Sequence, residues 1–122
     1  MQVPLTVSGP SGSHRFTVEV ARTATEQQRG LMYRRRLAPD RGMIFPLRRP
    51  EYAAFWMKNT LIPLDLIFIR ADGSIANIAA NARPKDERLI SSDGLVTEVL
   101  ELAGGRAAAL GITAGDRVDW AR

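Results

Sequence analysis

Apolar and polar residues alternate along several short stretches of this chain. Residues 3–9 (VPLTVSG) and 14–22 (HRFTVEVAR) are two such stretches, and the second places three apolar residues on one face. A period of two is typical of a β-strand with one buried face. Because the turn-forming sequence GPSGS (9–13) separates the two stretches, they are predicted to form a β-hairpin.

Further strands follow downstream. They are predicted at residues 43–47, 54–57, 64–70, 74–80, 95–102 and 116–120. Pro46 predicts an edge position or a bulge, since proline cannot donate to a ladder. Residues 66–69 are apolar on both faces, which predicts a central strand covered on both sides. The polar segment 81–94 is predicted to be a long loop.

Two segments have helical signals instead. Thr23 followed by Glu26 is a capping box, which predicts a short helix from Ala24 to about Tyr33. Gly30 falls inside that range, where a glycine costs about 1 kcal/mol relative to alanine, so it indicates close packing or an early helix end. GGRAAALG (104–111) predicts a second short helix closed by its last glycine. The fold class predicted by these patterns is mainly β with two short helices.

Length and composition fit one soluble globular domain. The chain has 122 residues, which leaves little room for a second core, so residues 1–122 are predicted to form a single domain. Hydrophobic residues make up 45% and charged residues 25% of the chain, a balance that supports a packed core. No transmembrane segment or export signal is apparent. The absence of cysteine excludes disulfides, thiol nucleophiles and thiolate metal sites.

Positive charge is concentrated in one part of the sequence. The net charge is +4, and Arg22–Lys58 holds 9 of the 17 basic residues but 3 of the 13 acidic ones. Such a segment could contact phosphates by releasing counterions. No helix-turn-helix, RNA-binding aromatic motif or zinc finger accompanies it, so nucleic acid is not favoured as a partner. The arginines concerned are Arg34, Arg35, Arg36, Arg41, Arg48 and Arg49.

The densest group of chemically useful side chains lies in FWMKNTLIPLD (55–65). Lys58 is one of only two lysines in a chain that otherwise uses arginine, which suggests a place for a compact ammonium. If the strands flanking residues 58–63 form a hairpin, Lys58 and Asp65 come within reach of each other. Asp65 shares a face with apolar residues, so its carboxylate requires an ion pair with Lys58 or hydrogen bonds from loop amides.

The same motif can instead form a ligand site. An aromatic surface with a few convergent polar groups suits a small polar ligand such as a sugar or a peptide. The candidate ligand-binding residues are Trp56, Lys58, Asn59, Thr60 and Asp65. Lys58 and Asp65 could alternatively act as the acid and base of an enzyme, although no catalytic residue is assigned. Glu98 and Glu101 are further carboxylates on another predicted strand, at a distance from the motif that the sequence does not give.

Methionines suggest a second alternative. Three of the four methionines, Met32, Met43 and Met57, are candidates, because thioethers select Cu(I) over harder ions. If the three converge, they would form a copper site. Methionine is also an adaptable core residue. Cu(I) binding therefore stays an alternative, and no metal site or cofactor is assigned.

Several motifs together resemble one protein family. They are RFTVEVARTATEQQRGLMYRRRL (15–37), GMIFPL (42–47), FWMKNTLIPLDLIFIRADGSI (55–75) and VLELAGGRAAALGITAGDRV (99–118). In order and spacing they resemble the bacterial and archaeal domain-of-unknown-function family 192. The resemblance implies a jelly-roll-like sandwich or partly open barrel, often placed behind an export signal and without a settled activity. It therefore favours a periplasmic or other extracytoplasmic location and an envelope component as partner.

Overall fold

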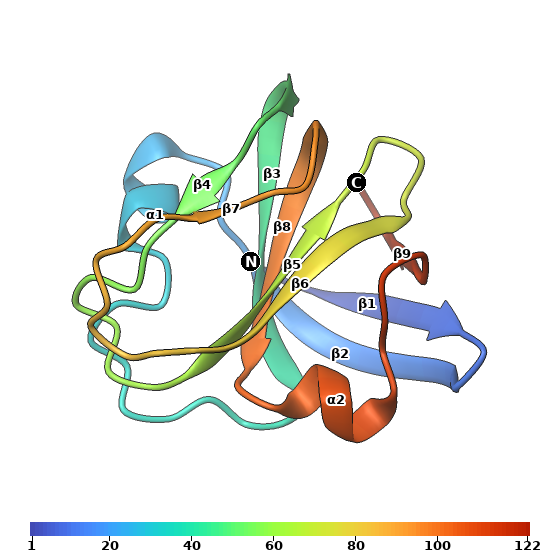
Figure 1. Cartoon of the computed structure of the whole chain (residues 1–122), viewed down its shortest axis with the longest axis horizontal. Coiled ribbons are helices and arrows are strands. Elements are labelled where there is room, and N and C mark those ends of the chain that lie inside the picture. Colours follow the sequence, from blue (N-terminus) through green and yellow to red (C-terminus); the bar gives the residue numbers. More distant parts are fainter.

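The alternating stretches form nine strands, and both predicted helices are present (Figure 1). The computed structural model describes residues 1–122. The helices are α1 (Ala24–Arg29) and α2 (Arg106–Leu110), and neither is long and apolar enough to cross a membrane. The strands are β1 (Gln2–Gly9), β2 (Gly12–Val20), β3 (Arg41–Glu51), β4 (Ala54–Phe55), β5 (Leu64–Ile69), β6 (Ile75–Ala82), β7 (Ile90–Ser91), β8 (Val96–Ala103) and β9 (Arg117–Trp120).

Seven of the strands form one mixed sheet in the order β6-β5-β8-β3-β2-β1-β9, and β4 pairs with β7 in a separate ribbon. The predicted hairpin of β1 and β2 is confirmed, with a tight turn between Gly9 and Gly12. A single bridge between Ser74 and Arg117 connects β9 to the turn before β6. The sheet therefore curls but stays open. This confirms the prediction of a single, mainly β domain, and the sheet that forms is open rather than closed.

Two groups of buried side chains occupy the two faces of this sheet. Alternate residues of β5 divide between them: Ile67 belongs to one group, and Leu66 and Phe68 belong to the other. All six residues of β5 are buried, as predicted for a central strand. Figure 1 shows α1, β4 and β7 on one side of the sheet and α2 at one end. The face that contains Leu66 and Phe68 is the one that the candidate site adjoins.

Proline in β3 is accommodated where that strand has only one neighbour. The parallel ladder between β2 and β3 ends at Ile44, so Pro46 has no strand on that side. On the other side the register with β8 shifts directly after Pro46. The missing N–H therefore costs no ladder bond to β2. β3 lies between β8 and β2 over its first half. At Pro46 it is an edge strand with a shift in register, as predicted.

Helix α1 begins as predicted and ends four residues early. The Thr23 hydroxyl accepts from the backbone N–H of Glu26 at 3.0 Å, and the Glu26 carboxylate accepts from the N–H of Thr23 at 2.9 Å. The helix ends because Gly30 adopts φ 48° and ψ −129°. A side chain at this position would also approach the Phe45 ring, since a Cβ would lie 3.3 Å from Phe45 Cζ. Close packing and an early helix end, the two reasons predicted for a glycine at this position, therefore both apply.

Gly30→Ala is expected to destabilise the protein by about 1–3 kcal/mol, because a non-glycine residue is strained at this φ and the new methyl group presses on Phe45. Urea unfolding at fixed pH measures the effect. Gly94→Ala is the matched control, since Gly94 also has a positive φ but nothing lies within 4 Å of its added Cβ. Equal losses in the two variants would show that the Phe45 contact contributes nothing.

The hairpin predicted around residues 58–63 does not form. β4 covers only Ala54–Phe55 and pairs with β7, a short strand inside the predicted loop 81–94. β5 pairs with β6 and β8 instead. Met57, predicted to end a strand, is fully buried, and its N–H donates to the Asp86 carbonyl at 2.8 Å. Alternation along a chain identifies a strand, but it does not identify the strand's partner.

Candidate functional site

Two adjoining cavities lie between α1 and the segment 54–60. They share Gln28, Arg29, Met32 and Trp56, and we call their combined space the α1–Trp56 cleft. The inner cavity has a volume of about 190 Å³, and the outer cavity about 350 Å³. Phe45, Phe55, Thr60 and Glu101 are among the residues of the inner cavity, and Thr25, Lys58 and Asn59 complete the outer one.

Glu101 brings an ionisable group into the inner cavity. It lies on β8, in the middle of the sheet, where its cross-strand partners are Met43 on β3 and Leu66 on β5. Directly paired residues point to the same face, so the carboxyl group has apolar neighbours on both sides. Glu101 is 5% exposed, and its carboxyl has no hydrogen bond or ion pair within the protein. Burial raises the pKa of Glu101 to about 8, because the charged form loses its hydration.

The other buried glutamate of β8 has a different environment. Glu98 is 4% exposed, and its carboxylate accepts from the Trp120 indole N–H at 3.0 Å. Arg122 also donates to both of its oxygens, at 2.7 and 3.0 Å. The same strand thus holds one buried carboxyl with a full set of protein partners and one with none. This contrast distinguishes Glu101 from an ordinary structural carboxylate.

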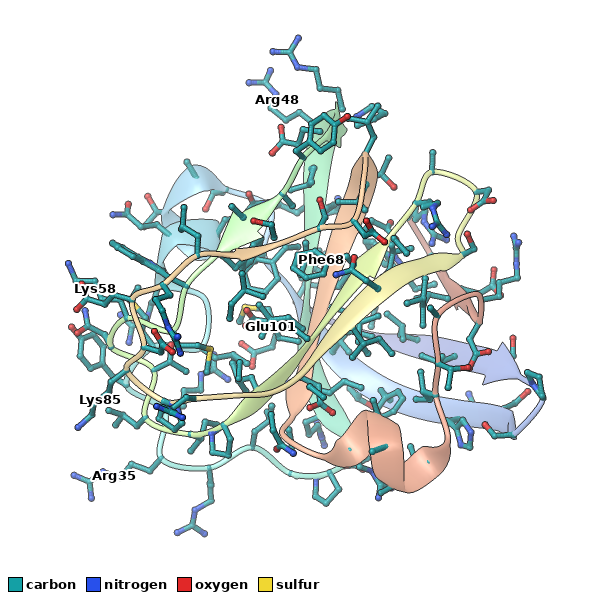
Figure 2. All side chains as sticks on the ribbon, in the orientation of Figure 1. Arg35, Arg48, Lys58, Phe68, Lys85 and Glu101 are labelled. Atoms are coloured by element: carbon teal, nitrogen blue, oxygen red, sulfur yellow. The ribbon has the colours of Figure 1, made fainter.

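Cationic side chains stand at the mouth of the cleft. The Lys58 Nζ lies 5.1 Å from the centroid of the Trp56 ring, which is 43% exposed. A cation–π contact at such an exposed site is worth about 0.5–1 kcal/mol. Arg29, from the last turn of α1, borders both cavities. Neither Arg29 nor Lys58 belongs to any of the five ion pairs of the chain. The cleft is therefore lined by one acid and two unpaired cations. Figure 2 shows Glu101 in the middle of the sheet and Lys58 at the side of the molecule.

The wall that carries Lys58 is held by backbone hydrogen bonds to strained neighbours. The Asn59 carbonyl accepts from the N–H of Tyr33 at 2.9 Å, and the Thr60 carbonyl accepts from the N–H of Lys85 at 3.0 Å. Tyr33, Asn59 and Lys85 are three of the four non-glycine residues with positive φ in the chain. Such conformations cost roughly 1 kcal/mol or more each and persist only where the surroundings impose them. The wall is therefore fixed in position.

Asp65 has a structural role away from the cleft. It is fully buried, and its Oδ1 accepts from the N–H groups of Asn81 at 2.9 Å and Gly105 at 3.0 Å. Its Oδ2 accepts from the N–H of Ala107 at 2.8 Å. These bonds join β5 to the start of α2. Of the two alternatives for Asp65, hydrogen bonds from backbone amides therefore form and the ion pair with Lys58 does not, since Lys58 lies in the segment between β4 and β5 and no hairpin brings it to Asp65.

Four of the five predicted ligand-binding residues border the cleft. They are Trp56, Lys58, Asn59 and Thr60, whereas Asp65 binds backbone amides. Sequence reasoning did not place Glu101 or Arg29 in the site. Glu101 does leave a signal, since it is a carboxylate on the apolar face of an otherwise buried strand. Arg29 precedes Met32 by three residues, and this proximity makes it a possible anion contact from the sequence alone.

The three motif methionines do not all occupy the same environment. Met43 and Met57 belong to the buried group on one face of the sheet, and Met32 borders the cleft. No group of three or more histidine, cysteine, aspartate or glutamate side chains is placed to hold a metal ion. Cu(I) binding through the methionines stays a prediction.

The arginine-rich segment does not form one continuous patch. Arg34 makes a bidentate ion pair with Glu19, so the guanidinium of Arg34 is already occupied. Arg35 and Arg48 lie at opposite ends of the molecule in Figure 2. A sequence run of positive charge is therefore divided between separate surfaces and partly neutralised.

Comparison with known proteins identifies the family of this chain. The model of the DUF192 family, described as "Uncharacterized ACR, COG1430", matches residues 6–120. A crystal structure of a protein of unknown function from Novosphingobium aromaticivorans DSM 12444 has 52% identity and a TM-score of 0.96, over 98% of this chain and 85% of that chain. A crystal structure from Sinorhizobium meliloti 1021, provisionally described as a transcription regulator, has 41% identity and a TM-score of 0.95, over 98% and 94% of the two chains. No curated protein matches. The chain belongs to the DUF192 family.

Proposed function

We propose that this protein binds a small polar ligand, such as a sugar or a short peptide, in the α1–Trp56 cleft. The observation that carries the proposal is Glu101, a buried carboxyl group without a protein partner at the floor of a cavity. The protein offers this carboxyl no hydrogen-bond donor, so water or a ligand in the inner cavity must supply its hydrogen bonds. A ligand that hydrogen-bonds to Glu101 would therefore take a place that no protein group fills.

The walls of the cleft support the same proposal. Phe45 and Phe55 meet edge to face with their ring centroids 5.2 Å apart, and both border the inner cavity. Trp56 adds a ring that is partly exposed. Aromatic surface beside a few polar groups is the usual composition of a small-molecule site. Thr60 at the floor, and Lys58 and Asn59 at the mouth, provide those polar groups.

Other functions receive less support. An enzyme that used Lys58 and Asp65 as acid and base would need both groups at one site, and Asp65 is fully buried among backbone amides. The description of the Sinorhizobium meliloti relative would suggest a regulatory role. Arg34, Arg36 and Arg41 do border one pocket, but Arg34 pairs with Glu19 there. Arg48 lies at the opposite end of the molecule from Arg35 in Figure 2. An extracytoplasmic location stays a prediction.

Trp56→Ala is expected to weaken ligand binding at least tenfold, because it removes the largest apolar surface at the mouth of the cleft. A panel of monosaccharides, disaccharides and dipeptides is screened by thermal shift, and isothermal titration calorimetry then measures the affinity of each compound that raises Tm. Tyr52→Ala is the matched control, since Tyr52 is an exposed aromatic residue that does not border the cleft. Equal loss of affinity in both variants, or no shift with any compound at millimolar concentration, would contradict the proposal.

A further inference from the structure

We infer that the ligand is a zwitterion, a free α-amino acid or a very short peptide, whose ammonium group contacts Glu101 and whose carboxylate contacts Arg29 and Lys58. The inference rests on the proposed function and specifies its ligand class. Its basis is the distribution of charge along the cleft: Glu101 borders only the inner cavity, Lys58 borders only the outer cavity, and Arg29 borders both.

The floor of the cleft suits an ammonium group. The carboxyl group of Glu101 is unpaired, and its neighbours Met43 and Leu66 have no charge to offer it. The rings of Phe45, Phe55 and Trp56 border the same cavity, and their electron-rich faces attract cations. A positively charged nitrogen would gain a charge-assisted hydrogen bond from the carboxylate as well as this attraction. A sugar hydroxyl would gain neither to the same extent.

The mouth of the cleft suits a carboxylate. Arg29 and Lys58 are unpaired cations, and no acidic side chain other than Glu101 borders either cavity. A guanidinium binds a carboxylate with well-defined geometry, and a lysine ammonium adds a point charge. A ligand with only a positive charge would be repelled by these two groups. A zwitterion places each of its charges beside the opposite one and adds no net charge to the site.

The size of the inner cavity limits the occupant further. Its volume is about 190 Å³, whereas pockets for drug-sized ligands begin at roughly 300 Å³. One amino acid, or the first residue of a peptide continuing into the outer cavity, is therefore the appropriate size. An oligosaccharide is too large for the part of the cleft that contains Glu101.

Proton release provides a readout specific to this arrangement. Of the charged groups that line the cleft, Arg29 from α1 borders the same cavity as Glu101 and Lys58 borders the adjoining one, while the neighbours of Glu101 on β3 and β5 are apolar. An ammonium favours the ionised form of Glu101, whose pKa burial raises to about 8. Binding near pH 7 should therefore release up to one proton per ligand. Calorimetry in two buffers of different ionisation enthalpy measures this number.

The test first titrates the full chain with the common L-amino acids. The amino acid that binds most tightly is then compared with its N-acetyl derivative, its amide and its glycine-extended dipeptide. D-glucose is titrated as an uncharged ligand. We expect each blocked derivative to bind at least tenfold more weakly than the free amino acid. Glu101→Gln should abolish proton release and weaken amino-acid binding at least tenfold. Arg29→Ala should weaken the amino acid but not its amide. Arg48→Ala is the control, because Arg48 lies far from Lys58 in Figure 2. Retained far-UV circular dichroism verifies that each variant folds.

The outcomes separate this inference from the proposed function. Tight binding of D-glucose or of the N-acetyl derivative, with no dependence on a free ammonium group, would overturn the zwitterion and leave the binding site in place. The same conclusion follows if the amino acid binds without proton release and equally well to Glu101→Gln. Binding by none of the amino acids, derivatives, sugars or peptides would overturn both.

Discussion

Glu101→Gln is expected to stabilise the protein by roughly 3–5 kcal/mol at pH 9 and to leave its stability almost unchanged at pH 4. The reason is the burial of this carboxyl, which raises its pKa from an ordinary value of 4.5 to about 8. Below pH 4.5 the group is protonated in both the folded and the unfolded chain. As the pH rises, the unfolded chain loses this proton first, so the wild-type fold loses stability between about pH 4.5 and 8. Glutamine is neutral throughout and avoids this loss.

Urea unfolding of wild type and Glu101→Gln at pH 4, 7 and 9 measures the difference. Glu98→Gln is the matched control on the same strand. It should destabilise the protein, because the neutral amide loses the charge-assisted bonds with Arg122. A Glu101→Gln variant that is no more stable than wild type at pH 9 would show that the Glu101 carboxylate has a favourable partner in the folded chain. That result would remove the main support for a ligand site.

Asp65→Ala is expected to destabilise the protein by roughly 3–5 kcal/mol, because it removes a fully buried carboxylate and leaves three N–H groups, one buried and two partly buried, without an acceptor. Those groups belong to Asn81, Gly105 and Ala107. Asp65→Asn should cost somewhat less, since one oxygen remains while the new amide N–H₂ faces a donor. The start of α2 should open in both variants. Hydrogen exchange at Gly105 and Ala107 should therefore accelerate more than exchange in β2.

Asp119→Asn is the control for Asp65, because Asp119 is exposed on β9 and pairs only with Arg117 at the surface. Its loss should stay within about 0.5 kcal/mol. Unchanged stability of Asp65→Ala would contradict the structural role. Asp65→Asn should also retain the affinity of the α1–Trp56 cleft at temperatures where it is folded. A selective loss of affinity would return Asp65 to the ligand site.

The extent to which the site could be predicted differs from residue to residue. Trp56, Lys58, Asn59 and Thr60 are close in sequence, so any structure that exposes this segment brings them together. Glu101 lies 45 residues beyond Trp56 along the chain. It reaches the same cavity only because β8 is inserted between β3 and β5. The hydrogen-bond partners of Asp65 could not be predicted for a related reason, since they come from Asn81 and the start of α2, which are distant from it in sequence.

The sequence by itself determined the mainly β class, the β1–β2 hairpin, the capping box of α1 and the buried strand β5. Each of these depends on a local pattern, such as alternation, a turn between strands or a cap three residues from its partner. Tertiary structure decided that β4 pairs with β7 and that Glu101 lies within the cleft while Glu98 pairs with Arg122. These outcomes depend on which distant strands become neighbours. A strand's own alternation shows which side chains share a face, but the elements packed against that face decide whether a carboxyl group finds a partner there.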